Sequence, residues 1–225
     1  MADADRPQIY LITPPDLDLM VFPDRLAAVL DSTEIACIRL SLASHDEDRI
    51  GRAADALRAV AHARDVALVI ESHVLMVERL GLDGVHLTDG GRSIRKVRKD
   101  LGSDAIIGAY CGTTRHDGIS AAEAGADYVA FGPVGQTPLG DGSHAEAELF
   151  EWWSEMIEVP VVAEGSLTTD LIAKLGPITD FFGVGNEIWQ TQDAAKSLRD
   201  LMAIAPAAPC ETHCRSLKKA CLKPV

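Results

Sequence analysis

Eight short apolar segments, alternating with segments of helical periodicity, predict an α/β fold: a single (βα)8, or TIM, barrel over residues 1–204. The eight units average about 25 residues each, enough for the smallest such barrels. The apolar segments are continuous, as in parallel strands buried on both faces. An open doubly wound sheet is the rival fold, but such sheets usually stop at five or six strands, so the number of units favours the barrel.

Each predicted strand is rich in Val, Ile, Leu or aromatic residues and is bounded by polar or glycine-containing turns. In order along the chain, the predicted strands cover residues 8–13, 35–40, 67–71, 84–87, 106–110, 128–132, 159–164 and 181–184. The clearest predicted helix covers residues 48–64, where Ile50, Ala54, Leu57 and Ala61 recur at intervals of three and four along one face.

Residue types typical of helix ends occur between the predicted strands. Four side chains can accept a hydrogen bond from the free N–H groups at a helix start: Asp16, Ser93, Thr114 and Thr168. Three glycines can adopt the left-handed conformation that often ends a helix: Gly102, Gly125 and Gly176.

Composition narrows the class of protein. A chain of 225 residues with 47% hydrophobic content can bury the core of one large domain. The 34 acidic and 21 basic residues, a net charge of −13, argue against general affinity for nucleic acid or an anionic membrane. No signal-peptide pattern and no apolar run of about 18 residues occurs, so we expect a cytoplasmic protein. Five cysteines, an odd number, suit free thiols in a reducing compartment.

Residues 205–225 differ in character and are predicted to be a tail outside the barrel domain. They carry four Lys or Arg residues and one Glu. Cys210, His213, Cys214 and Cys221 could ligate a soft metal, but their spacing does not match the usual paired C-x-x-C pattern. We therefore predict a structural or incidental role for them and no metal site.

Ligands of a TIM barrel bind at the carboxyl ends of its strands and in the loops that follow. Two such loops are typical of phosphate binding. The segment AEGSLTTD places Gly165 and Ser166 before a helix, and FGVGNEIW places Gly185 and Asn186 before a short one. The long segment GPVGQTPLGDGSHAE after the sixth strand is typical of a ligand-binding loop, with an ordinary surface connection as the alternative.

Charged and titratable residues end several predicted strands. Arg39 must either meet an anion at the barrel mouth or pair internally with a carboxylate such as Glu71. His73 and His86 can act as acid, base or metal ligand, or can be hydrogen-bonded structural residues. Glu71 and Glu164 end strands on opposite sides of the barrel, so we expect no close carboxylate pair and no metal cluster.

The chain resembles a known group, the thiamine phosphate synthase and thiazole tautomerase superfamily. The segments that carry the resemblance occur in order over residues 8–204: YLIT, CIRLSL, DGVHLTD, IIGAYCGTT, GADYVAFGPV, VPVVAEGSLT and FFGVGNEI. It implies a barrel that joins a hydroxymethylpyrimidine diphosphate to a thiazole phosphate, with Mg²⁺ assisting the departure of pyrophosphate. By resemblance, the ligand-binding positions are Arg39, Gly132, Pro133, Thr137, Gly165 and Asn186.

The chain departs from the pattern of the superfamily where the diphosphate and Mg²⁺ would bind. In the motif Gln-x-Arg-x-Lys, the glutamine and lysine positions hold Cys37 and Ser41. The motif Asn-Asp-Asp after the third strand is replaced by the residues 71–73, Glu-Ser-His. After the fourth strand, Gly-Gln-Glu-Asp is replaced by the residues 88–91, Thr-Asp-Gly-Gly, which leaves Asp89 as one substitute ligand.

Two further positions differ. The lysine expected late in the long loop aligns with Gly140, and the histidine that tautomerases use aligns with Pro133. Losing these groups should remove several kcal/mol of transition-state stabilisation from a diphosphate reaction.

Three functions follow from these observations. The first is a synthase in which His73, Asp89 or Glu71 replaces the missing Mg²⁺ ligands. The second is a non-catalytic or regulatory barrel that binds a phosphorylated metabolite. The third is an isomerase or lyase that uses Glu164 or His86 as acid or base.

The expected partner is a small phosphorylated metabolite, not nucleic acid or membrane, and a homodimer is left open. The predicted ligand-binding residues are Arg39, Glu71, His73, His86, Asp89, Gly132, Pro133, Thr137, Gly165, Ser166, Gly185 and Asn186.

Overall fold

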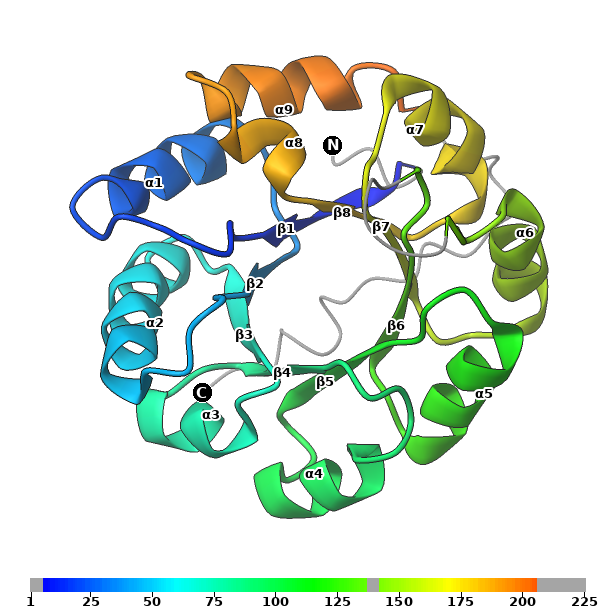
Figure 1. Ribbon diagram of the computed structural model, residues 1–225, viewed down its shortest axis with the longest axis horizontal. Helices are drawn as coiled ribbons and strands as arrows, with labels where there is room; N and C mark the ends of the chain where they lie inside the picture. The colour runs from blue at the N-terminus through cyan, green and yellow to red at the C-terminus, as the bar shows by residue number, and fades with distance from the viewer. Residues whose placement is uncertain (1–5, 137–141, 206–225) are drawn as a thin grey trace.

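The computed structural model describes residues 6–136 and 142–205, and within them eight parallel strands close into a barrel (Figure 1). Each strand pairs with the next, and β1 pairs with β8 to complete the ring. The strands are β1 Gln8–Ile12, β2 Cys37–Leu40, β3 Ala67–Glu71, β4 Gly84–Leu87, β5 Ile106–Tyr110, β6 Tyr128–Phe131, β7 Val161–Glu164 and β8 Phe181–Val184. The TIM-barrel prediction is confirmed.

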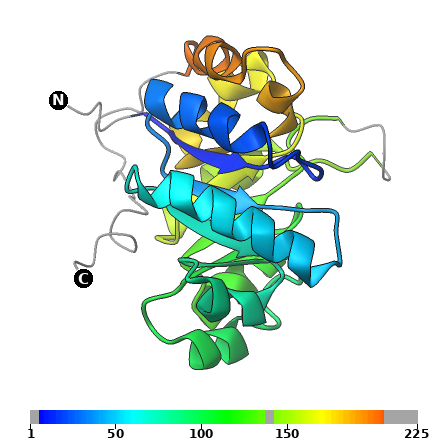
Figure 2. The same cartoon turned by 90° about the vertical axis from the view of Figure 1, so that its left-hand side faces the viewer.

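Helices surround the barrel, and in the side view of Figure 2 they lie along the outside of the strands. They are α1 Phe22–Ser32, α2 Glu47–His62, α3 Val74–Leu80, α4 Ile94–Leu101, α5 Arg115–Ala124, α6 Ala147–Met156, α7 Thr169–Leu175, the 3₁₀ turn η1 Gly176–Ile178, α8 Asn186–Trp189 and α9 Ala194–Met202. None of the helices in the described ranges has the length and apolar character needed to cross a membrane.

The strand predictions hold in number and order, with small differences at the ends. Strands β2 and β7 begin two residues later than predicted, at Cys37 and Val161. At β7 the reason is Pro160, which has no N–H to donate to a ladder, although its carbonyl accepts from Val129 at 3.0 Å. Such end differences do not change which residues reach the carboxyl edge.

Two predicted helix caps are confirmed. The Thr114 hydroxyl accepts from the Asp117 N–H at 3.2 Å, and the Thr168 hydroxyl accepts from the Leu171 N–H at 3.3 Å. Gly125 adopts the left-handed conformation that ends α5. These local signals are correct because each cap depends only on residues next to it in sequence.

Three other cap predictions are wrong. Asp16 does not cap α1, which begins at Phe22 with a proline in its first turn. The hydroxyl of Ser93 donates to the Asp89 carboxylate and makes no cap bond. Gly176 has right-handed dihedral angles, because the chain continues from α7 into the 3₁₀ turn.

Two apolar clusters build the core. The larger one fills the space between the strands and the surrounding helices. The smaller one fills the inside of the barrel: Tyr10, Cys37, Ala67, Val69, Ile106, Tyr128, Ala130, Val162 and Phe181. Gly108 leaves room for the Tyr128 ring, since a Cβ added at this position would lie 2.0 Å from the Tyr128 Cζ. The barrel interior is therefore a packed core, and ligands can reach only its ends.

Candidate functional site

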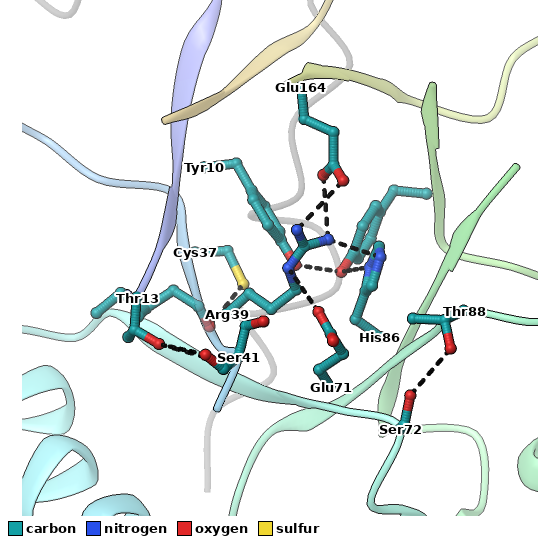
Figure 3. Close-up of polar contacts among 12 residues, drawn as sticks. Tyr10, Thr13, Cys37, Arg39, Ser41, Glu71, Ser72, His86, Thr88 and Glu164 are labelled. Atoms are coloured by element: carbon teal, nitrogen blue, oxygen red, sulfur yellow. Dashed lines mark hydrogen bonds and ion pairs between the residues drawn. The ribbon is translucent and has the colours of Figure 1, made fainter. Parts of the chain in front are cut away.

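The candidate site lies at the carboxyl ends of the strands, where the barrel interior changes from apolar to polar. Arg39 on β2, Glu71 on β3, His86 on β4 and Glu164 on β7 point toward one another above the apolar interior (Figure 3). Side chains two residues apart on a strand share one face, so the layer containing Arg39 lies directly above the layer containing Cys37.

The guanidinium of Arg39 is the centre of this layer and is 6% exposed. Its two terminal nitrogens lie 3.0 and 3.2 Å from the two carboxylate oxygens of Glu164, a bidentate contact. Its Nε lies 3.6 Å from the Glu71 carboxylate, and Nη1 donates to His86 Nε2 at 2.7 Å. Three side chains of this protein, Glu164, Glu71 and His86, therefore contact the Arg39 guanidinium.

His86 connects Arg39 to two buried tyrosines. A guanidinium can only donate, so His86 Nε2 is the acceptor and the ring proton of a neutral imidazole lies on Nδ1. Nδ1 can then donate to the Tyr128 hydroxyl at 3.0 Å, and the Tyr128 hydroxyl lies 2.5 Å from that of Tyr10. Complete burial and the neighbouring Arg39 charge both hold the pKa of His86 well below its usual value. His86 is thus a neutral structural link at neutral pH.

The charges of this layer are mostly satisfied internally. Burial is the largest single effect on the pKa of Arg39 and would lower it, but the neighbouring groups together, the Glu164 carboxylate first among them, outweigh burial and raise the pKa, so Arg39 stays charged. Burial raises the pKa values of Tyr10 and Tyr128 well above the usual range, so both stay neutral. Arg39 is the only Lys or Arg in the eight strands, while Glu71 and Glu164 are the strands' two acidic residues. The layer therefore carries no excess positive charge.

This arrangement resolves the alternatives for Arg39 in favour of an internal pair. The predicted partner Glu71 does contact it, but Glu164 makes the closer contact. We expected Glu71 and Glu164, on opposite sides of the barrel, to be independent. That expectation missed their common partner, because an arginine in the centre of a barrel reaches carboxylates on both sides.

The loops after β6, β7 and β8 form the other side of the mouth. The Val134 N–H donates to Glu164 O at 3.0 Å, and the Gly135 N–H donates to Gly165 O at 3.0 Å. Gly165 has φ +89°, and an added Cβ would lie 2.9 Å from Pro133 Cα, so only glycine fits here. Gly132, Pro133, Gly165 and the neighbouring Ser166 are thereby brought together.

A carboxylate that sequence reasoning missed bridges the two predicted phosphate loops. Glu187, in the first turn of α8, accepts from the Leu167 N–H at 3.1 Å and from the Gly185 N–H at 2.8 Å. An acidic residue after the glycine of a helix start is the signal that could have indicated it. Tyr10 and Tyr128 were also missed as site residues, although they lie two and three residues before the carboxyl ends of β1 and β6.

The remaining predicted site residues lie at other helix starts or in loops of the described ranges, or outside those ranges. His73 lies at the start of α3. Asp89 accepts a hydrogen bond from Ser93 at 2.5 Å. Asn186 is the first residue of α8. Thr137 lies outside the described residues, as do Gly140 and the tail 206–225.

The residues present do not fit a Mg²⁺ site. Within the described ranges, no group of three or more His, Cys, Asp or Glu side chains is placed to hold a metal ion. Glu71 contacts Arg39, and Asp89 accepts from Ser93. The Ser72 hydroxyl, at a position where the superfamily has an aspartate, lies 3.1 Å from that of Thr88. A hard cation that prefers several carboxylate or carbonyl oxygens finds no such set in this part of the chain.

Fold and site together define a TIM barrel with a polar layer of side chains at its carboxyl mouth. Comparison with known proteins identifies the family: residues 9–177 match the family model described as thiamine monophosphate synthase. The chain is 39% identical to the thiamine-phosphate synthase of Rhodospirillum centenum over 186 residues, which cover 81% of this chain and 89% of that protein. The chain belongs to the thiamine monophosphate synthase family.

Further similarities agree with this assignment. The chain is 37% identical over 202 residues to the thiamine-phosphate synthase of Erythrobacter litoralis, covering 87% of this chain and 94% of that protein. Among solved structures, the thiamine phosphate pyrophosphorylase of Pyrococcus furiosus has a TM-score of 0.75 at 20% identity, covering 90% of this chain and 96% of that chain. The structural likeness, at this identity, supports the fold.

Proposed function

We propose that this chain is a ligand-binding barrel of thiamine metabolism that binds a small heterocyclic metabolite at its carboxyl mouth and does not perform the synthase coupling. One observation carries the proposal: the guanidinium of Arg39, the only Lys or Arg side chain in the strands, is paired with Glu164 and Glu71 and bonded to His86. The group that would receive a diphosphate is already engaged inside the protein.

The electrostatics support this proposal. A diphosphate leaving group carries about three negative charges and needs cations or metal ions that stabilise it as it departs. Here it would approach a layer with two carboxylates and one guanidinium. The two other motif positions offer no replacement, since Cys37 is buried in the apolar interior and the Ser41 side chain carries no charge.

Synthase activity itself is the second candidate, and sequence similarity favours it. Relatives named thiamine-phosphate synthase are 39% and 37% identical over most of the chain. Under this candidate, His73, Asp89 or Glu71 would recruit Mg²⁺ once substrate is bound, which requires Glu71 to leave Arg39.

A coupling assay separates the two candidates. The full chain is incubated with hydroxymethylpyrimidine diphosphate, thiazole phosphate and Mg²⁺, and both thiamine phosphate and pyrophosphate are measured. The Rhodospirillum centenum relative serves as the positive control under the same conditions. We expect product from the control and none above background from this chain. Equimolar formation of both products by this chain would establish the second candidate.

Binding is measured separately, by isothermal titration with the pyrimidine and thiazole compounds, each in its unphosphorylated and its phosphorylated form, in the absence of Mg²⁺. We expect at least one of them to bind at a single site, and we expect an Arg39→Gln variant to weaken it, because the variant disturbs the layer below the ligand. A chain that neither turns over nor binds any of these compounds would contradict the proposed function.

A further inference from the structure

The Glu187 carboxylate lies where a TIM barrel commonly holds a phosphate. The loops after the seventh and eighth strands are the usual phosphate-binding pair in this fold, and they bind through backbone N–H groups. In this chain one N–H from each loop, those of Leu167 and Gly185, donates to an oxygen of Glu187, at 3.1 and 2.8 Å. The two oxygens of one side chain thus accept a hydrogen bond from each of the two loops.

Charge makes this replacement selective. A phosphate monoester carries about 1.5 to 2 negative charges at neutral pH. A phosphate that used the same two N–H groups would have to displace the Glu187 carboxylate. A phosphate that bound beside these groups would be repelled by that carboxylate. A nearby cation could offset this repulsion, but Arg39 is the only Lys or Arg in the strands and is paired with Glu164. The strands themselves therefore offer a phosphate at the mouth no cation that is not already paired.

The polar layer below offers hydrogen bonds to a ligand that carries no phosphate. Arg39 Nε and Glu164 Oε2 are buried and lack a hydrogen bond of good geometry within the described residues, although both make ion contacts. One is a donor and the other an acceptor. An uncharged or cationic heterocycle that presents both kinds of group complements such a layer better than an anion does.

We propose that Glu187 is a built-in substitute for the phosphate of the ligand, so that the mouth of this barrel selects an unphosphorylated heterocycle over its phosphate ester. This inference rests on the proposed function for the existence of a heterocycle site. Glu187 is then a specificity-determining residue. It accepts the hydrogen bonds of the two N–H groups, and its negative charge repels a phosphate.

The test compares matched ligand pairs that differ only by the phosphate: thiazole alcohol with thiazole phosphate, and thiamine with thiamine phosphate. Each is titrated calorimetrically into the wild type, Glu187→Ala and Glu187→Gln. The control variant is Glu123→Ala, which removes an exposed negative charge on α5. Near-UV circular dichroism verifies that each variant keeps the native packing.

We expect the wild type and Glu123→Ala to bind the unphosphorylated member at least tenfold more tightly. Glu187→Ala frees both N–H groups and removes the charge, so this ratio should fall at least tenfold or reverse. Glu187→Gln keeps one acceptor oxygen and should shift the ratio in the same direction by less. A wild type that binds the phosphate ester as well or better would overturn the proposal, and so would a ratio unchanged in Glu187→Ala.

Failure of the proposed function gives a different result. If the wild type binds neither member of either pair, inorganic phosphate is titrated into the wild type and into Glu187→Ala. Phosphate binding gained only in Glu187→Ala supports Glu187 as the occupant of the anion position, even though the heterocycle is wrong. No gain in that variant overturns the inference as well.

Discussion

At the scale of single residues, Arg39 has the largest structural consequence. It is almost completely buried and pairs with Glu164, whose side chain is also mostly buried. Replacing both members of a buried pair by apolar groups is often tolerated, but removing one member leaves a buried charge without compensation. The pair therefore holds β2 and β7 in place across the barrel only while both charges are present.

We predict that Arg39→Met lowers the free energy of unfolding by about 3 to 5 kcal/mol, because Glu164 is left unpaired. The double variant Arg39→Met with Glu164→Gln should regain at least half of this loss. Urea denaturation monitored by circular dichroism measures both. Arg49→Met, which breaks an exposed pair with Asp16, is the control and should cost at most about 1 kcal/mol. A similar small cost for Arg39→Met would show that the buried pair is not required.

His86 predicts a dependence of stability on pH. It is buried against Arg39 of β2, Tyr128 of β6 and Tyr10 of β1, and its pKa in the folded state is held well below the usual value. The unfolded chain takes up a proton as the pH falls below about 6.5, whereas the folded chain does not. The stabilisation by neutral His86 is thus complete above this pH and is lost as the pH decreases.

We predict that the unfolding free energy decreases below pH 6.5 with a slope approaching about 1.4 kcal/mol per pH unit from His86 alone. The measurement is urea denaturation at several pH values between 7.5 and 5.5, for the wild type and for His86→Gln. The difference between the two curves cancels the contribution of the other histidines. Parallel curves would contradict a neutral, buried His86.

At the scale of elements, features that depend on neighbours in sequence could be predicted, whereas contacts between distant segments could not. The strand cores, the caps at Thr114 and Thr168 and the glycine end of α5 follow from neighbours in sequence, and they could be predicted. Asp16 and Ser93 have suitable side chains but bond elsewhere, to Arg49 and Asp89, which no local pattern indicates. A side chain of a capping type therefore does not by itself establish a cap, because its partner depends on what packs nearby.

The caps provide a matched test at this scale. We predict that Thr114→Ala costs about 1 kcal/mol of stability, because the hydroxyl satisfies the Asp117 N–H at the start of α5. Ser93→Ala changes the same position of α4 without removing a cap bond, so its cost should be less than half as large. Chemical denaturation of the two variants gives the comparison, and equal costs would contradict the assignment of the caps.

At the scale of the whole molecule, the closure of the barrel and the net charge both affect the stability and solubility of the folded chain. The closed ring leaves no exposed sheet edge, since β1 pairs with β8. A net charge of −13 promotes solubility but repels itself in the compact state. Screening that repulsion should stabilise the folded chain.

We predict that raising NaCl from about 20 to about 200 mM, which shortens the screening length to under about 10 Å, raises the melting temperature by roughly 2 to 4 °C. Differential scanning calorimetry measures the shift. Choline chloride at the same ionic strength is the control and should act equally, because screening does not depend on which cation is present. A melting temperature that falls with salt would mean that attractive surface pairs outweigh the repulsion.

Local patterns in the sequence were enough to establish the number of strands, their order and the loops that would meet at the mouth, because apolar runs, caps and glycine turns act over a few residues. They could not establish the chemistry of that mouth. Arg39 meets Glu164 from 125 residues away, and Glu187 meets Leu167 across two loops. Only closure of the barrel brings these groups within hydrogen-bonding distance, because the residues that meet belong to different strands and loops.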